Sequence, residues 1–318
     1  MRVLCKRTNE IDDAEILQIY DLFYLIFGKK RDIETFRSEY SNTPLGYSFH
    51  SLLYDNTDAI VGFHSCMPFY YMNGHQRFLA ALGIDSMVKQ EYRDYFNFRD
   101  MITVCQERLR KEGCILRIGF PNDNSYPILK KGLKHRDIGK LTTYCMVHNL
   151  GAVSPKLSLF NIFSRCFSLM QYLFSYFSID NKIYTFQYHK ERETFDAVRY
   201  NWFGGDYRRI NEGSFRFVYK IEMYNNVRTA FLLDVFPLSK KNFEAAVRYI
   251  YRKERSSIDM ILYVGKLPFV PISLLTVPHK FEPKHFNFTC KPLVEGYFDN
   301  SIYDIRNWDV NLSNYDLL

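Results

Sequence analysis

The sequence predicts a mixed α/β protein with two consecutive domains, on three observations. The chain has 318 residues, 47% hydrophobic and 24% charged, which fits an ordered globular protein of one large or two ordinary domains. Aromatic residues make up 17% of the chain, and this share favours strands and broad packed faces over a purely helical fold. An order of two strands, a helix and a further strand is predicted once in each half, which indicates a duplicated unit.

The opening of the chain predicts a strand, a helix and then three strands. Val3 to Arg7 is typical of a strand, and Asp12 to Gly28 carries apolar residues at helical spacing. Turn-forming residues follow at 43–46. Short polar turns separate the next apolar runs, which predicts antiparallel strands at 47–54, 59–71 and 78–88.

A strand that leads directly into a helix occupies the centre of the first half, from Leu79 to Asn122. The strand ends in the turn EYRDYFNF, and the following helix is expected to begin under an Asn97 cap and to end at Gly113. A further strand is predicted from Cys114 to Phe120. The start of such a helix directs backbone N–H groups and a positive dipole end at the turn, which suits a phosphate, and Arg93 adds charge there.

Two stretches of this region, KQEYRDYFNF and GFPNDNSYPILKKGL, resemble the GNAT superfamily of acyl-CoA N-acyltransferases. In that family the strand before the turn pairs with the pantetheine arm of coenzyme A (CoA). An Arg/Gln-x-x-Gly-x-Gly/Ala turn wraps the CoA pyrophosphate, but Phe96 and Phe98 stand here where the family has glycine. The resemblance implies acetyl-CoA or another acyl-CoA as co-substrate, held by Met87, Val88, Arg93, Asp94, Tyr95, Phe96, Asn97, Phe98 and Asn122.

Two residues are candidates for proton transfer. Asp85 lies on the strand beside the expected course of the CoA and suits a general base. The ordinary alternative is a strand-end acid that hydrogen-bonds a neighbouring loop. The tyrosine acid of the resembled family would fall at Ile128 or Leu129, which carry no proton to donate, so Tyr126 is the candidate acid; its alternative is a plain aromatic at a helix start.

Charge and cysteine content favour a reduced cytoplasmic protein. The formal net charge of +7 suits an anionic ligand, but basic and acidic residues are interleaved, and we expect no nucleic-acid partner. The seven cysteines are scattered without a Cys-x-x-Cys pair, and the first residues are charged, unlike a signal peptide. His64 and His75 lack spaced partners, so no metal site is expected.

The segment Lys156 to Ser178 is apolar and aromatic except for a stripe of polar residues at three- and four-residue intervals. It predicts a helix that is polar along one face, and its Arg165 and hydroxyl groups argue against a membrane-spanning helix. Two interpretations remain open. The favoured one is a connector buried between two domains, and the other is a helix resting on a bilayer, as a peripheral contact at the inner membrane face.

The second half repeats the order of the first. We predict strands at 214–222 and 229–236, a helix at 239–253 that begins under a Ser239 cap, and a strand at 258–264, with Asp234 at the place of Asp85. The turn after Asp234 offers neither arginine nor glycine, so this copy is expected to be degenerate. The segments YNWF, with Trp202, and NWDVNLSNYDLL, with Trp308, Asp309 and Asp316, resemble tandem GNAT proteins of bacterial surface-polysaccharide synthesis.

These expectations divide the chain into a GNAT-like domain with the acyl-CoA site at 1–150, an apolar connector helix at 151–180 and a second GNAT-like domain at 181–318. The resemblance implies an N-acyltransferase whose acceptor is a small-molecule amine, such as an amino sugar or sugar nucleotide. One alternative is a non-catalytic GNAT-fold protein that serves as a binding or structural partner. Another is a Fem-type aminoacyltransferase, although the basic tRNA platform or helical arm that it needs is not evident.

Overall fold

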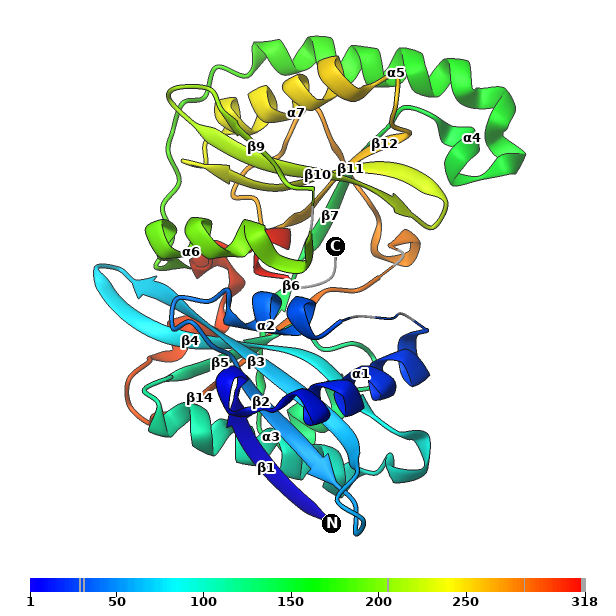
Figure 1. The fold of residues 1–318 in the computed structure, drawn as a ribbon. Coiled ribbons are helices and arrows are strands. Elements are labelled where there is room, and N and C mark those ends of the chain that lie inside the picture. The colour runs from blue at the N-terminus through cyan, green and yellow to red at the C-terminus, as the bar shows by residue number, and fades with distance from the viewer. Residues whose placement is uncertain (29, 31, 205, 283, 316–318) are drawn as a thin grey trace. The chain divides into compact units, whose positions relative to one another are not determined.

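The computed structural model describes residues 1–315 except 29, 31, 205 and 283, and residues 202–204 without their side chains (Figure 1). Asp316 and the side chain of Trp202 therefore lie outside the described part. The chain forms two compact units, each assembled from three separate segments and not from one continuous range as expected. The first unit comprises Met1–Gly139, Gln187–Gly204 and Phe286–Asn307, and the second comprises Lys140–Phe186, Gly205–His285 and Trp308–Leu318.

The first unit contains a mixed sheet in the order β1-β2-β3-β4-β5-β14-β6, with β8 paired to β3. The pairing of β4 with β5 is parallel, whereas β1 to β4 form an antiparallel run and β14 is antiparallel to β5. The strand bounds are β1 (Arg2–Arg7), β2 (Phe49–Tyr54), β3 (Ile60–Asn73), β4 (Gln76–Val88), β5 (Leu116–Gly119), β6 (Arg136–Lys140), β8 (Tyr188–Lys190) and β14 (Asn287–Pro292).

Helices cover both faces of this sheet. The helix α3 (Tyr95–Lys111) packs on one face through residues at the predicted helical spacing, among them the fully buried Cys105 and Leu109. On the other face lie α1 (Asp13–Phe27) and α2 (Ile33–Ser41), and α6 (Arg192–Val198) follows β8. The helix α1 lies within the predicted range Asp12 to Gly28, where Asp12 caps its start and Gly28 ends it in the left-handed conformation.

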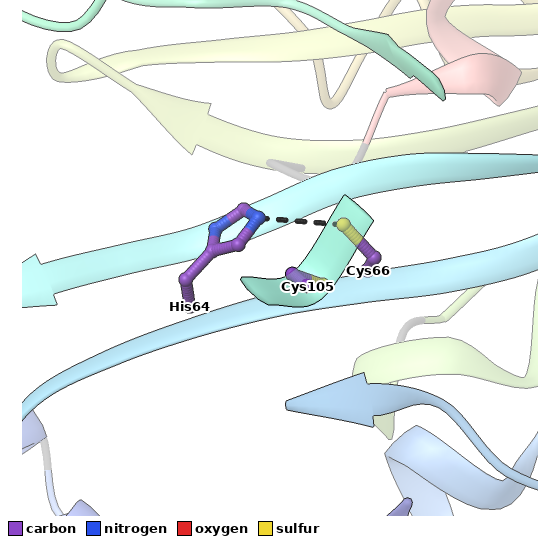
Figure 2. Close-up of side chains that lie close together, drawn as sticks. All are labelled: His64, Cys66 and Cys105. Carbon is purple, nitrogen blue, oxygen red and sulfur yellow. Dashed lines mark hydrogen bonds between the residues drawn. The ribbon is translucent and has the colours of Figure 1, made fainter. Parts of the chain in front are cut away.

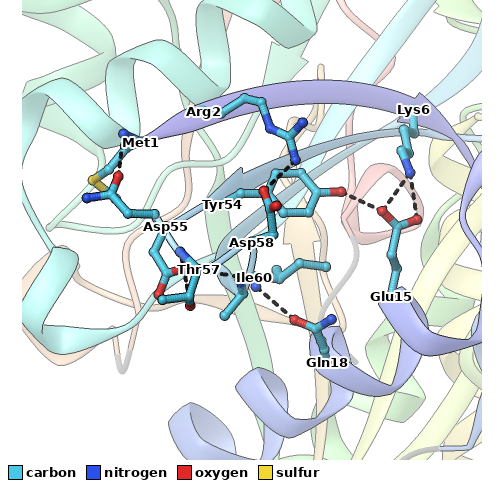
Figure 3. A network of polar contacts seen from close by, with 12 residues as sticks. Met1, Arg2, Lys6, Glu15, Gln18, Tyr54, Asp55, Thr57, Asp58 and Ile60 are labelled. Carbon is cyan, nitrogen blue, oxygen red and sulfur yellow. Dashed lines mark hydrogen bonds and ion pairs between the residues drawn. The ribbon is translucent and has the colours of Figure 1, made fainter.

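Polar contacts fix α1 against the strands (Figure 3). The carboxylate of Glu15 accepts hydrogen bonds from Lys6 Nζ at 2.6 Å and from the Tyr54 hydroxyl at 2.5 Å. One turn later, Gln18 Oε1 accepts from the backbone N–H of Ile60 at 2.9 Å. Because these partners come from β1, β2 and β3, they set the position of α1 over three strands at once.

The second unit has a sheet in the order β13-β7-β12-β11-β10-β9. Its core gathers buried aromatic and aliphatic residues of the strands beneath α7 (Lys240–Glu254), which begins at the predicted Ser239 cap. The helices α4 (Leu150–Val153) and α5 (Asn161–Phe174) also belong to this unit. The strands are β7 (Thr142–Val147), β9 (Arg208–Asn211), β10 (Arg216–Tyr224), β11 (Val227–Phe236), β12 (Met260–Gly265) and β13 (Leu275–Thr276).

The strand order is the same around the central hairpin of each unit. In the first, β3 and β4 are antiparallel, α3 follows, and β5 lies parallel to β4; in the second, β10, β11, α7 and β12 repeat this order. Both hairpins contain a register shift, beside Asp85 in β4 and beside Asp234 in β11. These elements confirm the mixed α/β class that the sequence predicts.

The burial expected for the apolar segment at 156–178 is wrong. The large apolar side chains of α5 are mostly exposed, with Ile162 at 71% and Phe163 at 70%, while the polar side chains of Ser168 and Gln171 are buried. Helical spacing distinguishes a polar stripe from the rest of a helix, but it does not say which of the two meets the core. No helix in the described part of the chain is both long enough and apolar enough to cross a membrane.

Candidate active site

A bulge interrupts β4 at Asp85. In the pairing of β3 with β4, Phe63 lies opposite Met87 and Ser65 lies opposite Ile84, so β4 carries one more residue than its partner over this stretch. Asp85 adopts a φ of 44°, a left-handed conformation that is uncommon for residues other than glycine. Bulges of this kind redirect side chains and are common beside active sites.

The strands β4 and β5 stay paired for only a short distance. Their parallel pairing runs from Ala80 and Leu116 to Gly83 and Gly119, whereas β4 continues to Val88. Gly119 is buried, yet nothing lies within 4 Å of the place where a Cβ would be. The end of β4 therefore presents a strand edge beside open space.

Met87 and Val88, at the end of the strand expected to pair with the pantetheine arm, direct their side chains into the core. Met87 and Val88 are 3% and 7% exposed, and Val88 packs with Leu53 and Met101. Only the backbone of these two residues can meet a ligand. This arrangement fits an extended ligand that adds to the strand edge through main-chain hydrogen bonds.

The carboxylate of Asp85 accepts a hydrogen bond from the hydroxyl of Tyr40. Tyr40 comes from α2 and is buried, with its ring edge-on to His50 at 4.8 Å and close to Phe36 at 4.7 Å. The partner of Asp85 is thus a rigid helical residue and not the neighbouring loop of the ordinary alternative. The helix α2 was not predicted from the sequence, although Phe36 and Tyr40 are four residues apart behind an Asp32 cap.

The start of α3 already holds an anion. Asp94, and not the expected Asn97, is the cap, and its carboxylate accepts from the backbone N–H of Asn97 at 2.7 Å. The Asn97 side chain donates to the carbonyl of Tyr92 at 2.9 Å and to Asp94 at 2.8 Å. The carboxylate therefore uses an N–H group and the dipole end that a pyrophosphate would need.

The other residues of the turn leave part of it accessible. Arg93 is exposed, and its Nε donates to the carbonyl of Val88 at 2.8 Å, which closes the turn on the end of β4. Phe96 is 62% exposed, with the Arg99 guanidinium over its ring. Phe98 instead packs into the core beneath α3. Phe96 and Phe98 stand where the resembled motif has glycine, but both are helical residues of α3 and do not form part of a glycine turn.

Tyr95, the first residue of α3, packs against a neighbouring turn. Its phenol lies directly against Gly132, where a Cβ would overlap the ring. Gly132 ends the short helical segment Ile128–Gly132, so this contact joins the start of α3 to the chain that follows β5. The Tyr95 side chain is therefore held beside the turn that the sequence assigns to the pyrophosphate.

The remaining predicted residues are engaged elsewhere. The Asn122 side chain accepts from the backbone N–H groups of Asn124 and Ser125 and so caps the local turn. The Tyr126 hydroxyl donates to Asp137 at 2.8 Å and receives a hydrogen bond from Lys130 at 3.1 Å, in an exposed cluster. No contact joins Tyr126 to Asp85 within the described residues.

A buried polar cluster that the sequence analysis did not predict lies under α3 (Figure 2). The donor atoms of His64, Cys66 and Cys105 lie within 4.8 Å of one another, with His64 Nε2 3.3 Å from Cys66 Sγ. Arg117 is 3% exposed and donates to His135 Nε2 at 2.8 Å and to His64 Nε2 at 3.3 Å. The spacing His-x-Cys on one strand, which places both side chains on one face, was the available signal.

Arg117 gives this cluster a positive charge. No carboxylate of the described residues lies within ion-pair distance of its guanidinium, and its Nε lacks a hydrogen-bond partner there. Burial would raise the pKa of the Cys66 thiol, but the Cys105 thiol, His64 and Arg117 hold that pKa well below its ordinary value. These contacts favour the thiolate form of Cys66, whose negative charge would offset the buried guanidinium.

A second group of potential metal ligands lies in the second unit. His279 Nδ1 and His285 Nδ1 are 2.9 Å and 3.4 Å from Glu282 Oε2. These distances are close to the edges of a tetrahedral zinc site, whose bonds of about 2.0 Å place ligand atoms roughly 3.3 Å apart. The His279 and His285 side chains are 52% and 40% exposed, and Lys140 Nζ lies 3.2 Å from His279 Nε2.

Comparison with known proteins shows that the fold is that of GNAT proteins. A protein of Enterococcus faecalis described as a probable N-acyltransferase is similar over 92% of this chain and 73% of its own, with 14% identity and a TM-score of 0.56. GCN5-related N-acetyltransferases of Anabaena variabilis and Kribbella flavida, each 11% identical, give TM-scores of 0.58 and 0.55 over 92% of this chain and 73% and 71% of theirs. No family model and no curated protein matches the sequence.

Proposed function

We propose that the chain is an acyl-CoA-dependent N-acyltransferase that acts on a small-molecule amine. The observation that carries the proposal is the end of β4, where a bulge at Asp85 adjoins a strand edge and open space beside Gly119. The GNAT fold shared with structures described as acetyltransferases supports the same reaction class. An acyl thioester is long and flexible, and a strand edge of this kind suits it.

The reaction would be a direct transfer. The amine nitrogen attacks the thioester carbonyl carbon, an amide bond forms, and the carbon–sulfur bond breaks to release the CoA thiolate. Asp85 takes the proton that the amine loses, directly or through a water molecule, and backbone N–H groups of 84–88 stabilise the oxyanion. Tyr126 remains the predicted acid for the thiolate, although its hydroxyl already donates to Asp137.

The pyrophosphate turn fits CoA less well than the strand edge does. Arg93 supplies a positive charge at the turn, but the Asp94 carboxylate caps the helix that would receive the phosphates. Tyr95, Phe96, Asn97 and Phe98 offer backbone N–H groups to the phosphates, but those of Asn97 and Phe98 already donate to Asp94. We therefore expect acyl-CoA to bind mainly through its pantetheine arm and acyl group, with a weak phosphate contribution.

The acceptor proposed from the sequence is an amino sugar or a sugar nucleotide of polysaccharide synthesis. The matching strand order and paired bulges of the two units support descent from a duplicated GNAT unit, of which only the first keeps an arginine in its turn. Release of the CoA thiol from acetyl-CoA in the presence of amino sugars, sugar nucleotides and simple polyamines tests both reaction and acceptor class. Activity with polyamines alone would contradict the sugar acceptor but would still support acyl transfer from acetyl-CoA to an amine.

A second candidate is a GNAT-fold protein without catalysis, and the Asp94 cap is the observation that favours it. Titration calorimetry with acetyl-CoA separates the two candidates. Heat that saturates at submillimolar or low millimolar acetyl-CoA supports the enzyme. Absence of binding at millimolar acetyl-CoA would remove the enzymatic proposal and leave the binding role.

A further inference from the structure

The helix α5 is amphipathic, and its buried side chains are polar. Ser168, Gln171 and Ser175 are at most 6% exposed, and they bond to the body of the second unit. Gln171 Nε2 donates to the carbonyl of Ser273 at 3.0 Å, and Arg248 donates to the carbonyl of Ser175 at 2.7 Å. These contacts fix which side of the helix faces out.

The outward side forms an apolar face. It consists of Leu159, Ile162, Phe163, Leu173, Phe177 and Ile179, with exposed fractions from 52% for Leu173 to 87% for Leu159. Residues 155–179 contain no aspartate or glutamate, and Lys156 and Arg165 are their only charges. Exposed groups of large apolar side chains mark interaction sites, and the lack of acidic residues here suits an anionic partner.

An arginine pocket of about 490 Å³ lies beside α5, which contributes Arg165 to its lining. Arg165, Arg228 and Arg255 line the pocket together with His148 and Asp259. Asp259 is already engaged, because its carboxylate accepts from Asn149 Nδ2 at 2.8 Å and from the backbone N–H of Arg228 at 2.9 Å. None of the three guanidinium groups has an ion pair among the described residues, so the pocket carries surplus positive charge.

We propose that the segment 155–179 lies in the interfacial layer of an anionic phospholipid bilayer, with the apolar face among the acyl chains and a lipid phosphate in the arginine pocket. The 14 residues of α5 span about 21 Å, less than the roughly 30 Å of a hydrocarbon core, so the helix lies along the surface. Buried apolar area and attraction to anionic headgroups are the two terms that bind such helices. Both are present at α5, which carries the exposed apolar residues and supplies Arg165 to the pocket.

Co-sedimentation with vesicles tests the proposal. Wild-type protein should bind vesicles of phosphatidylcholine with phosphatidylglycerol, and bind vesicles of phosphatidylcholine alone several-fold more weakly. The double variant Ile162→Ser, Phe163→Ser should lose binding on the order of tenfold or more, because two inserted side chains are removed. Val270→Ser, an equally exposed apolar position of the second unit, is the matched control and should bind as wild type.

The lipid phosphate is tested by charge removal inside and outside the pocket. Arg255→Gln should weaken binding to anionic vesicles more than the control Lys253→Gln does. Lys253 is exposed and lies two residues from Arg255, so the control removes the same charge outside the pocket. Equal losses would overturn the headgroup site, and absence of vesicle binding would overturn the whole proposal. Two other results would also overturn it: saturation by inorganic phosphate without vesicle binding, or a dimer in sedimentation velocity that the double variant dissolves. Because the substituted side chains are exposed, unchanged circular dichroism should accompany every variant.

Discussion

The hydroxyl of Tyr40 donates a hydrogen bond to the carboxylate of Asp85 and so joins α2 to the bulge in β4. Tyr40 is held by its own packing among Phe36, His50 and Phe63, so it orients the carboxylate without moving itself. If Asp85 is the base, its geometry depends on a helix more than forty residues earlier in the chain.

Replacing Asp85 with Asn should lower kcat by about two to four orders of magnitude, because an amide cannot take the amine proton. The affinity for acetyl-CoA should change little. Tyr40→Phe should lower kcat less, since the carboxylate stays but loses its orienting partner. Asp100→Asn, an exposed pair with the adjacent Arg99, is the control. Steady-state kinetics with calorimetry measures both effects, and an unchanged kcat in Asp85→Asn would exclude the base.

Asp94→Asn should tighten acetyl-CoA binding by about two- to fivefold, because it removes a negative charge from the helix start while asparagine still caps the helix. The matched control is Asp32→Asn, the corresponding cap of α2, which should leave affinity unchanged. Calorimetry at low ionic strength measures the difference. Weaker binding in Asp94→Asn would show that the carboxylate serves the ligand.

Arg93→Ala should weaken acetyl-CoA binding on the order of tenfold, since a charge-assisted phosphate contact contributes about 1.5 to 3 kcal/mol before solvent screening. Arg37→Ala, an exposed arginine paired with Asp13, should have no effect. Comparison of acetyl-CoA with acetyl-pantetheine sharpens the result. Arg93→Ala should weaken the binding of acetyl-CoA but not that of acetyl-pantetheine, which has no pyrophosphate. An equal loss of affinity for both ligands would contradict a phosphate contact.

Gly83 and Gly119 are paired neighbours on β4 and β5 with opposite surroundings. A Cβ on Gly83 would lie 2.6 Å from the Arg117 guanidinium, whereas one on Gly119 would meet nothing within 4 Å. Gly83→Ala should therefore lower the free energy of unfolding by about 1 to 3 kcal/mol, and Gly119→Ala should leave it nearly unchanged. Urea unfolding measures both. Equal losses would mean that Arg117 is free to move aside.

His50 should make the protein sensitive to mild acid. Burial, and then the neighbouring His64, lower its pKa to about 3, so the unfolded chain gains a proton below about pH 6.5 that the folded chain does not. Stability should therefore fall as the pH falls, by about 2 kcal/mol between about pH 7 and pH 5 from this residue. In urea unfolding, the free energy of unfolding of His50→Gln should therefore fall by about 2 kcal/mol less than that of the wild type over this pH range. Parallel losses in the two proteins would contradict the assignment.

Local patterns in the sequence predicted the elements but not all of their neighbours. The Ser239 cap and the helical spacing of Met101, Ile102 and Cys105 act within a few residues, so these helices could be placed. The insertion of β14 beside β5 joins residues about 170 positions apart, and no local signal encodes such a pairing.

Only those parts of the candidate site that depend on local patterns could be predicted from the sequence. The turn from Val88 to Phe98 follows from the adjoining strand and helix, and the structure retains both. The Tyr40 contact to Asp85 and the cluster of His64 with Arg117 depend on non-local packing. The Asp94 cap is also a local signal, since Asp94 directly precedes the helix, but we expected the cap at Asn97.

The position of β14 also constrains the order in which the protein can fold during its synthesis. This strand lies between β5 and β6, yet it leaves the ribosome 168 residues after the end of β5. At common elongation rates that interval lasts on the order of 10 to 30 seconds, during which an interior edge of the nascent sheet has no partner. The first unit therefore cannot complete its sheet until almost all of the second has been translated, and a chaperone that covers strand edges would be useful throughout that delay.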